Sequence, residues 1–148
     1  MRKIKKLQPD WVIISHGTNE SYNRQFSAEN FYRNLTKLIT RIQKNTNHAW
    51  ILLTTPGHSF RKKKFKNPDN AMVRDQIIRA ANEYNCGYWN FCNIMGDADA
   101  INLWSKNNLT ASDKIHLSKA GYQLKATRFF DAFLKNFSAH FNRDSLKP

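Results

Sequence analysis

Three short, mainly apolar segments alternate with longer segments in which apolar residues recur every three or four positions. The short segments are Trp11–Ile14, Ala49–Thr55 and Gly87–Phe91. The first two are continuously apolar, which is typical of strands buried on both faces of a parallel sheet. Strands that alternate with amphipathic helices predict an α/β fold with right-handed crossovers and helices on both faces of the sheet.

Three helices follow from the periodicity. The first begins after Ser27, the second at Asn67-Pro68, and the third and longest after Ser118, each with a polar residue suited to cap it. The last helix has an apolar face wide enough to cover much of the sheet. The loop before it contains one helical turn at Ile101–Trp104. The three apolar faces are Phe31, Leu35, Leu38, Ile39 and Ile42; Val73, Ile77, Ala80, Ala81 and Tyr84; and Tyr122, Ala126, Phe129, Phe130, Phe133, Leu134 and Phe137.

The composition fits one compact domain, because the chain has 148 residues, of which 41% are apolar. No window approaches the roughly 18 apolar residues that a membrane-spanning helix needs. The start, MRKIKK, is basic like the beginning of a signal peptide, but Pro9 and Asp10 interrupt the apolar run around them, so we expect no signal peptide. Cys86 and Cys92 would lie about 20 Å apart in an extended segment, which predicts free thiols.

The formal net charge of +13 raises the question of a polyanionic partner. Basic residues concentrate in Arg2–Lys6 and Arg61–Lys66, and the second run reads as a solvated loop. Aromatic residues that could stack on bases are limited there to Phe60 and Phe65, so we do not expect nucleic acid as a partner. The alternative function is a noncatalytic basic module that binds a polyanion, either nucleic acid or an anionic wall polymer, through this loop.

Three loops converge at the edge of the sheet where parallel strands end: residues 17–20, 56–59 and the loop that ends in residues 113–116. Asp113 precedes His116 by three residues, so the carboxylate can accept the Nδ1 proton and leave Nε2 free as a general base. Asn19 carries an amide N–H donor suited to an oxyanion that develops on an ester carbonyl. An Asp-x-x-His pair alone is more often a capping or surface arrangement, but together with Gly17 and Asn19 at the same edge it favours acyl transfer chemistry.

Three histidines, His16, His58 and His116, fall at the same predicted edge. Three imidazoles with an open fourth position would suit catalytic zinc. Their spacing is unlike the close His pairs of helical zinc sites. We therefore expect no metal and keep zinc as an alternative.

The GTNE and DKIH segments, at 17–20 and 113–116, resemble the third and fifth conserved blocks of the SGNH, or GDSL-type, esterase family. The similarity continues through PDWVIISHGTNESY, ILLTTP, NPDNAMVRDQI, YWNF, IMG and DKIHLSKAGYQL. It is nearest to a branch of acylhydrolases that includes cell-wall and carbohydrate O-acetylesterases.

The resemblance implies a flavodoxin-like three-layer α/β/α fold and a carboxylic ester hydrolase that needs no cofactor. By analogy His116 is the base, Asp113 orients it and Asn19 is an oxyanion donor. Gly17, Thr18 and Glu20 of the same block would contact the substrate, a small-molecule or polysaccharide ester. The family also suggests an extracytoplasmic location.

Two departures from the family pattern change this expectation. His16 and Gly57-His58 stand where relatives commonly carry an apolar residue and Pro-Asp, so the substrate-facing loops differ. The first block, a Gly-Asp-Ser that holds the nucleophile, and the glycine of the second block have no counterpart here. We therefore expect residues 1–148 to form one partial domain that lacks the first two strands and is inactive alone, through truncation, a misplaced start codon or a split gene.

The missing strands would leave the edge of residues 10–16 open. No proline or lysine interrupts the interior of this segment, so the edge is not protected against pairing. We expect either a separate N-terminal segment or self-association through this strand.

Overall fold

The structure, a computed structural model, describes residues 2–96 and 99–144, with side chains described through residue 136. Its centre is a parallel sheet in the order β1-β2-β5. The strands are β1 (Trp11–Ser15), β2 (Trp50–Thr54) and β5 (Gly87–Trp89), and Trp11 pairs with Trp50 at the start of the register. The predicted α/β fold, a parallel sheet flanked by helices, is confirmed.

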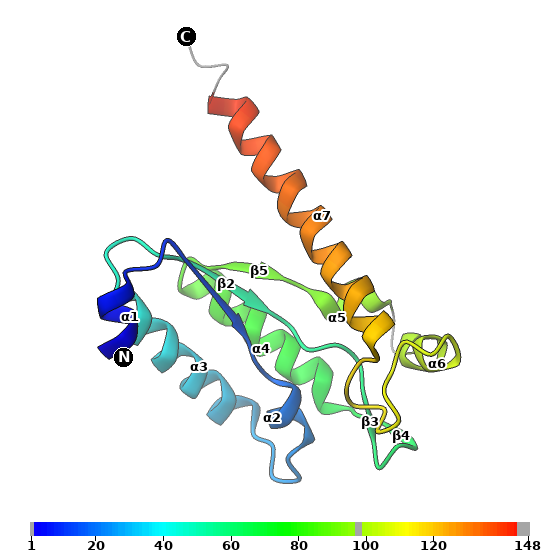
Figure 1. The fold of residues 1–148 in the computed structure, drawn as a ribbon. Helices are drawn as coiled ribbons and strands as arrows, with labels where there is room; N and C mark the ends of the chain where they lie inside the picture. The colour runs from blue at the N-terminus through cyan, green and yellow to red at the C-terminus, as the bar shows by residue number, and fades with distance from the viewer. Residues whose placement is uncertain (1, 97–98, 145–148) are drawn as a thin grey trace.

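Two helices cover one face of this sheet (Figure 1): α3 (Ala28–Gln43) and α4 (Asp69–Glu83). Ser27 caps α3 as predicted, since its Oγ accepts a hydrogen bond from the backbone N–H of Asn30. The capping position of α4 is Pro68 and not the predicted Asn67, whose Oδ1 accepts a hydrogen bond from the backbone N–H of Asp69 just before the helix. Both apolar stripes pack under the sheet as their periodicity predicts. The buried core here comprises Ile14, Phe31, Leu35, Ile39, Ile42, Ile51, Leu53, Val73, Ile77, Ala80 and Ala81.

The prediction that the first strand is buried on both faces is wrong. Trp11 is 49% exposed and Ile13 54%, and Trp50 beside them is 68% exposed. The long helix α7 (Lys119–Asp144) starts near the sheet and then projects away from it, so it does not cover much of this face as predicted (Figure 1). It contacts the sheet through aromatic pairs: Phe129 lies 5.1 Å from Trp89 and Phe133 5.7 Å from Trp11, measured between ring centroids.

A second apolar cluster lies at the other end of the molecule, around α5 (Phe91–Met95), α6 (Ala100–Lys106) and the start of α7. The predicted end of the third strand is wrong, because β5 stops at Trp89. Asn90 then caps α5 by accepting a hydrogen bond from the N–H of Asn93. The predicted helical turn lies within α6.

Four short elements complete the fold: α1 (Arg2–Leu7), α2 (Thr18–Tyr22), β3 (Phe60–Arg61) and β4 (Phe65–Lys66). The last two form an antiparallel hairpin inside the segment that was predicted to be a loop. Within the described residues, β1 has a strand on one side only, so its outer edge is open. Within the same residues, none of the helices combines the length and apolar character that a bilayer crossing requires.

Candidate active site

The turn after β1 depends on Gly17. Its φ of +112° lies in a region that favours glycine, and a Cβ there would approach Val73 Cγ1 to 2.4 Å. The Gly17 N–H donates to Glu20 Oε2 at 3.0 Å, which closes the first turn of α2. The turn therefore places Thr18 and Asn19 at the carboxyl end of the sheet.

Asp113 and His116 form the pair that their spacing predicts. His116 Nδ1 lies 2.6 Å from Asp113 Oδ2, while Asp113 Oδ1 accepts the backbone N–H groups of Ile115 at 2.8 Å and His116 at 2.9 Å. The hydrogen bond from the His116 ring, followed by the two backbone bonds, lowers the pKa of Asp113 from 3.8 to about 2. The ionised carboxylate thus holds the proton on Nδ1 and leaves Nε2 free.

The loop that carries this pair is closed at its base. Thr110 and Leu117 form an antiparallel bridge, and the Ala111 N–H donates to the His116 carbonyl at 2.8 Å. Ser118, the predicted cap of the last helix, accepts a hydrogen bond from the Gly121 N–H at 3.2 Å. The start of α7 and the pair are therefore held as one unit.

A cavity of about 170 Å³ brings the predicted loops together. Thr18, Asn19, His58 and His116 line it, so an amide donor and the free imidazole nitrogen share one space. Its remaining described lining residues are Ser15, His16, Pro56, Gly57, Phe91, Ile115, Leu117, Tyr122 and Lys125. This arrangement can remove a proton from a nucleophile and stabilise an oxyanion.

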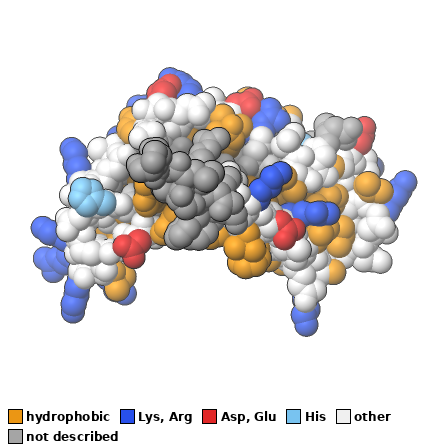
Figure 2. All heavy atoms as spheres, turned by 90° about the horizontal axis from the view of Figure 1, so that it is seen from above, with side chains coloured by type: hydrophobic (Ala, Val, Ile, Leu, Met, Phe, Trp, Pro, Cys, Tyr) orange, Lys and Arg blue, Asp and Glu red, His pale blue; other side chains and the backbone are white. Residues whose placement is uncertain are grey.

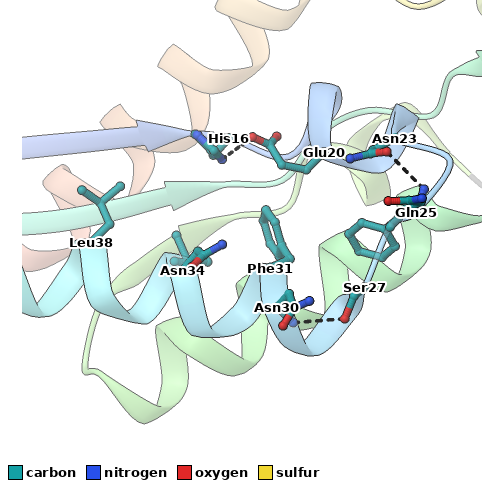
Figure 3. A pocket seen from close by; sticks show the side chains of 11 residues that line it. His16, Glu20, Asn23, Gln25, Ser27, Asn30, Phe31, Asn34 and Leu38 are labelled. Carbon is teal, nitrogen blue, oxygen red and sulfur yellow. Dashed lines mark hydrogen bonds and ion pairs between the residues drawn. The ribbon is translucent and has the colours of Figure 1, made fainter.

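Two of the predicted substrate-contacting residues lie elsewhere. Gly17 is buried beneath the turn, and Glu20 lines a separate cavity of about 480 Å³ between α2 and α3. In Figure 3 the Glu20 carboxylate points toward His16, whose Nδ1 lies 3.2 Å from Glu20 Oε1. The structure therefore gives Glu20 a local role in the turn.

The cavity of about 170 Å³ also contains Lys125, which the sequence did not single out, and Tyr122, which the sequence placed only on the apolar face of the last helix. Both come from α7, and the Lys125 ammonium lies 4.6 Å from the centroid of the Phe91 ring. Nothing in the helix periodicity separates a lysine at a cavity wall from one in solvent. Their recruitment depends on how α7 docks, which is a tertiary property.

Metal coordination receives no support from the geometry. Within the part of the chain that the structure describes, no three His, Cys, Asp or Glu side chains are arranged to hold an ion. His58 instead contacts Cys92, with Nε2 3.3 Å from Sγ. Cys92 and Cys86 are both free thiols, as predicted.

Comparison with known proteins decides the family. Residues 1–124 match the GDSL-like lipase/acylhydrolase family. The chain belongs to this family. Among curated proteins, no match to the sequence was found.

Solved structures share the fold of this GDSL-like chain. A peptidoglycan O-acetylesterase aligns with 93% of the chain at a TM-score of 0.86 and 21% identity, and the chain spans only 41% of that protein. An acetyl xylan esterase aligns with 88% of the chain at a TM-score of 0.68 and 21% identity, and the chain spans 70% of that protein. An acetylxylan esterase from Geobacillus stearothermophilus aligns with 86% of the chain at a TM-score of 0.62 and 19% identity, and the chain spans 61% of that protein.

Two basic side chains of the β3–β4 hairpin of this GDSL-like chain form ion pairs within the fold. Arg61 pairs with Asp69 and donates to the Ser21 carbonyl at 2.8 Å, and Lys66 pairs with Asp99. Figure 2 shows basic side chains spread over the face in view, with apolar side chains between them. Neutralising Arg61 would disturb the fold, because Arg61 joins the hairpin to Asp69 and Ser21.

Asp113→Asn tests the electrostatic description of the pair. Because the folded pKa of Asp113 is about 2 against an ordinary 3.8, the carboxylate stabilises the fold above pH 3.8, and this contribution is lost as the pH falls toward 2. Asn keeps an acceptor for the two backbone N–H groups, and the pair is partly exposed, so we expect a loss of about 1 kcal/mol or less. The Tm of the variant should lie below that of the wild type near pH 6, and this difference should disappear below about pH 3. A difference that stays constant with pH would contradict this description.

Proposed function

We propose that this chain supplies the general base, its orienting carboxylate and an oxyanion donor to a serine ester hydrolase. The observation that carries the proposal is the 2.6 Å Asp113–His116 bond beside a cavity that Asn19 also lines. His116 Nε2 accepts the serine proton as the hydroxyl attacks the ester carbonyl, and Asp113 stabilises the resulting imidazolium. The Asn19 amide donates to the oxyanion. His116 then returns the proton to the departing alcohol, and water releases the acyl group by the same steps.

None of the described side chains is placed to act as the nucleophile that this proposal needs. No hydrogen bond joins His116 Nε2 to a hydroxyl or thiol of a described residue. The Ser59 hydroxyl is buried and accepts a hydrogen bond from Asn70, while Cys92 is 1% exposed and burial raises the pKa of its thiol. Ser15 lines the cavity but makes no such bond.

The proposed source of the nucleophile is a segment outside these 148 residues that carries a Gly-Asp-Ser. Its strand would pair with the open edge of β1, because that edge ends at the cavity. The large share of the peptidoglycan O-acetylesterase that this chain does not span supports such a segment.

The proposed substrates are short acyl esters, above all acetyl esters, on carbohydrate or cell-wall polymers. The named activities of the similar structures, peptidoglycan O-acetylesterase and acetyl xylan esterase, support this choice. A cavity of about 170 Å³ leaves room for a short acyl group.

The test of the proposal begins with residues 1–148 alone on p-nitrophenyl acetate. We expect little or no turnover, because removing a triad nucleophile costs about 10⁶-fold in kcat and leaves only oxyanion and binding effects. Ser15→Ala should leave this background unchanged. Robust hydrolysis that both Ser15→Ala and His116→Ala abolish would place the nucleophile inside this chain and overturn the proposal.

A further inference from the structure

The cavity that contains His116 has an uneven charge distribution. None of the described residues that line it is an aspartate or glutamate, and Lys125 is the one lysine or arginine among them. Asp113 lies behind the imidazole, and Glu20 faces the separate cavity. A ligand in this space therefore meets a positive charge at the wall, while the two carboxylates lie behind the imidazoles of His16 and His116.

Lys125 is held at the cavity wall by aromatic packing. Its ammonium lies 4.6 Å from the centroid of Phe91, whose ring is itself fixed between Trp89 at 5.3 Å and Trp104 at 5.8 Å. The side chain is half-buried, and burial lowers the pKa of its amine. The long stem of this lysine is thus ordered before any ligand arrives.

The ammonium group of Lys125 can donate hydrogen bonds to a ligand. It carries three N–H donors, and no ion pair joins it to a carboxylate among the described side chains. An aromatic face attracts a cation but does not replace the hydrogen bonds that the amine loses on burial. An anionic group in the cavity would supply both the charge and the acceptors.

We propose that Lys125 binds an anionic substituent of the substrate, so that the site selects acylated sugars that carry a carboxylate. This inference rests on the proposed function, since it names the substrate class of the same cavity. Lys125 acts here as a specificity-determining residue, and the chemistry of acyl transfer stays with His116.

Binding measured by NMR tests the proposal without any need for turnover. The probes are N-acetylmuramic acid and N-acetylglucosamine, which share a ring and differ in the lactyl ether that carries the carboxylate. We expect the acid to shift signals of His116 and Lys125 and to bind about tenfold more tightly than the neutral sugar, as a charge-assisted hydrogen bond would give. A second pair, glucuronic acid and glucose, shows whether the site also binds a carboxylate that is attached at another position of the sugar ring.

Variants distinguish specific binding of the carboxylate by Lys125 from the general attraction of anions to a positively charged protein. Lys125→Gln should abolish the preference for the acid, and Lys125→Arg should keep most of it. Lys119→Gln removes the same charge from an exposed position on α7 and should leave the preference intact. Equal binding of both sugars by the wild type, or equal losses in Lys125→Gln and Lys119→Gln, would overturn the inference. Because binding is the readout, an inactive but acid-selective protein would contradict only the proposed hydrolysis.

Discussion

Gly121→Ala should destabilise the fold by about 2–4 kcal/mol, although alanine is the better helix former. A Cβ at Gly121 would lie 2.0 Å from the carbonyl oxygen of Leu109 and 3.0 Å from its carbonyl carbon. These are backbone atoms, and Leu109 also bonds to Trp104 and Ser118 at the base of the loop that carries Asp113 and His116. The helix or the loop must move, so both stability and the position of His116 should suffer.

Urea unfolding measures this effect, with Ala120→Gly as the matched control. Ala120 is the exposed neighbour of Gly121 on α7, so its substitution reports helix propensity alone and should cost about 1 kcal/mol. NMR signals of His116 should move in Gly121→Ala and stay in place in the control. A Gly121→Ala protein as stable as wild type would show that α7 does not pack this closely on the loop.

The largest effects on activity should appear once a Gly-Asp-Ser segment completes the site. In that complex His116→Ala should lower kcat by about 10⁴- to 10⁶-fold, because the serine loses its base. Asn19→Ala should cost about 10²- to 10³-fold, the loss that follows removal of one oxyanion donor. Glu20→Gln should change kcat much less, because glutamine can still accept the Gly17 N–H. Steady-state hydrolysis of p-nitrophenyl acetate measures all three, and a Glu20→Gln loss as large as that of Asn19→Ala would place Glu20 in the acyl-transfer site.

Local sequence signals predicted much of this fold and part of the site. The apolar spacing of α3 and α4 and the short runs of β1 and β2 reflect contacts that each element makes along one face. The pairing of Asp113 with His116 was predictable because a three-residue spacing within a tight turn determines it.

The remaining features depend on tertiary docking. Continuous apolar runs indicated two buried faces, yet Trp11 and Ile13 are exposed because α7 leaves the sheet. The start of α7 packs closely on the loop, with Gly121 against the carbonyl of Leu109, and no periodicity reveals this contact. Lys125 reaches the cavity for the same reason.

The most direct measurement of the central claim is the location of a fluorophosphonate label, which reacts with activated serines. Residues 1–148 are incubated with the reagent, with and without a polypeptide that carries the Gly-Asp-Ser strand, and mass spectrometry identifies the modified residue. We predict no label on this chain alone, and a label on the serine of the added segment that disappears when His116→Ala replaces the wild type. A label on Ser15 or any other residue of this chain, formed without the segment, would contradict the assignment of His116 as a base that serves a nucleophile from outside.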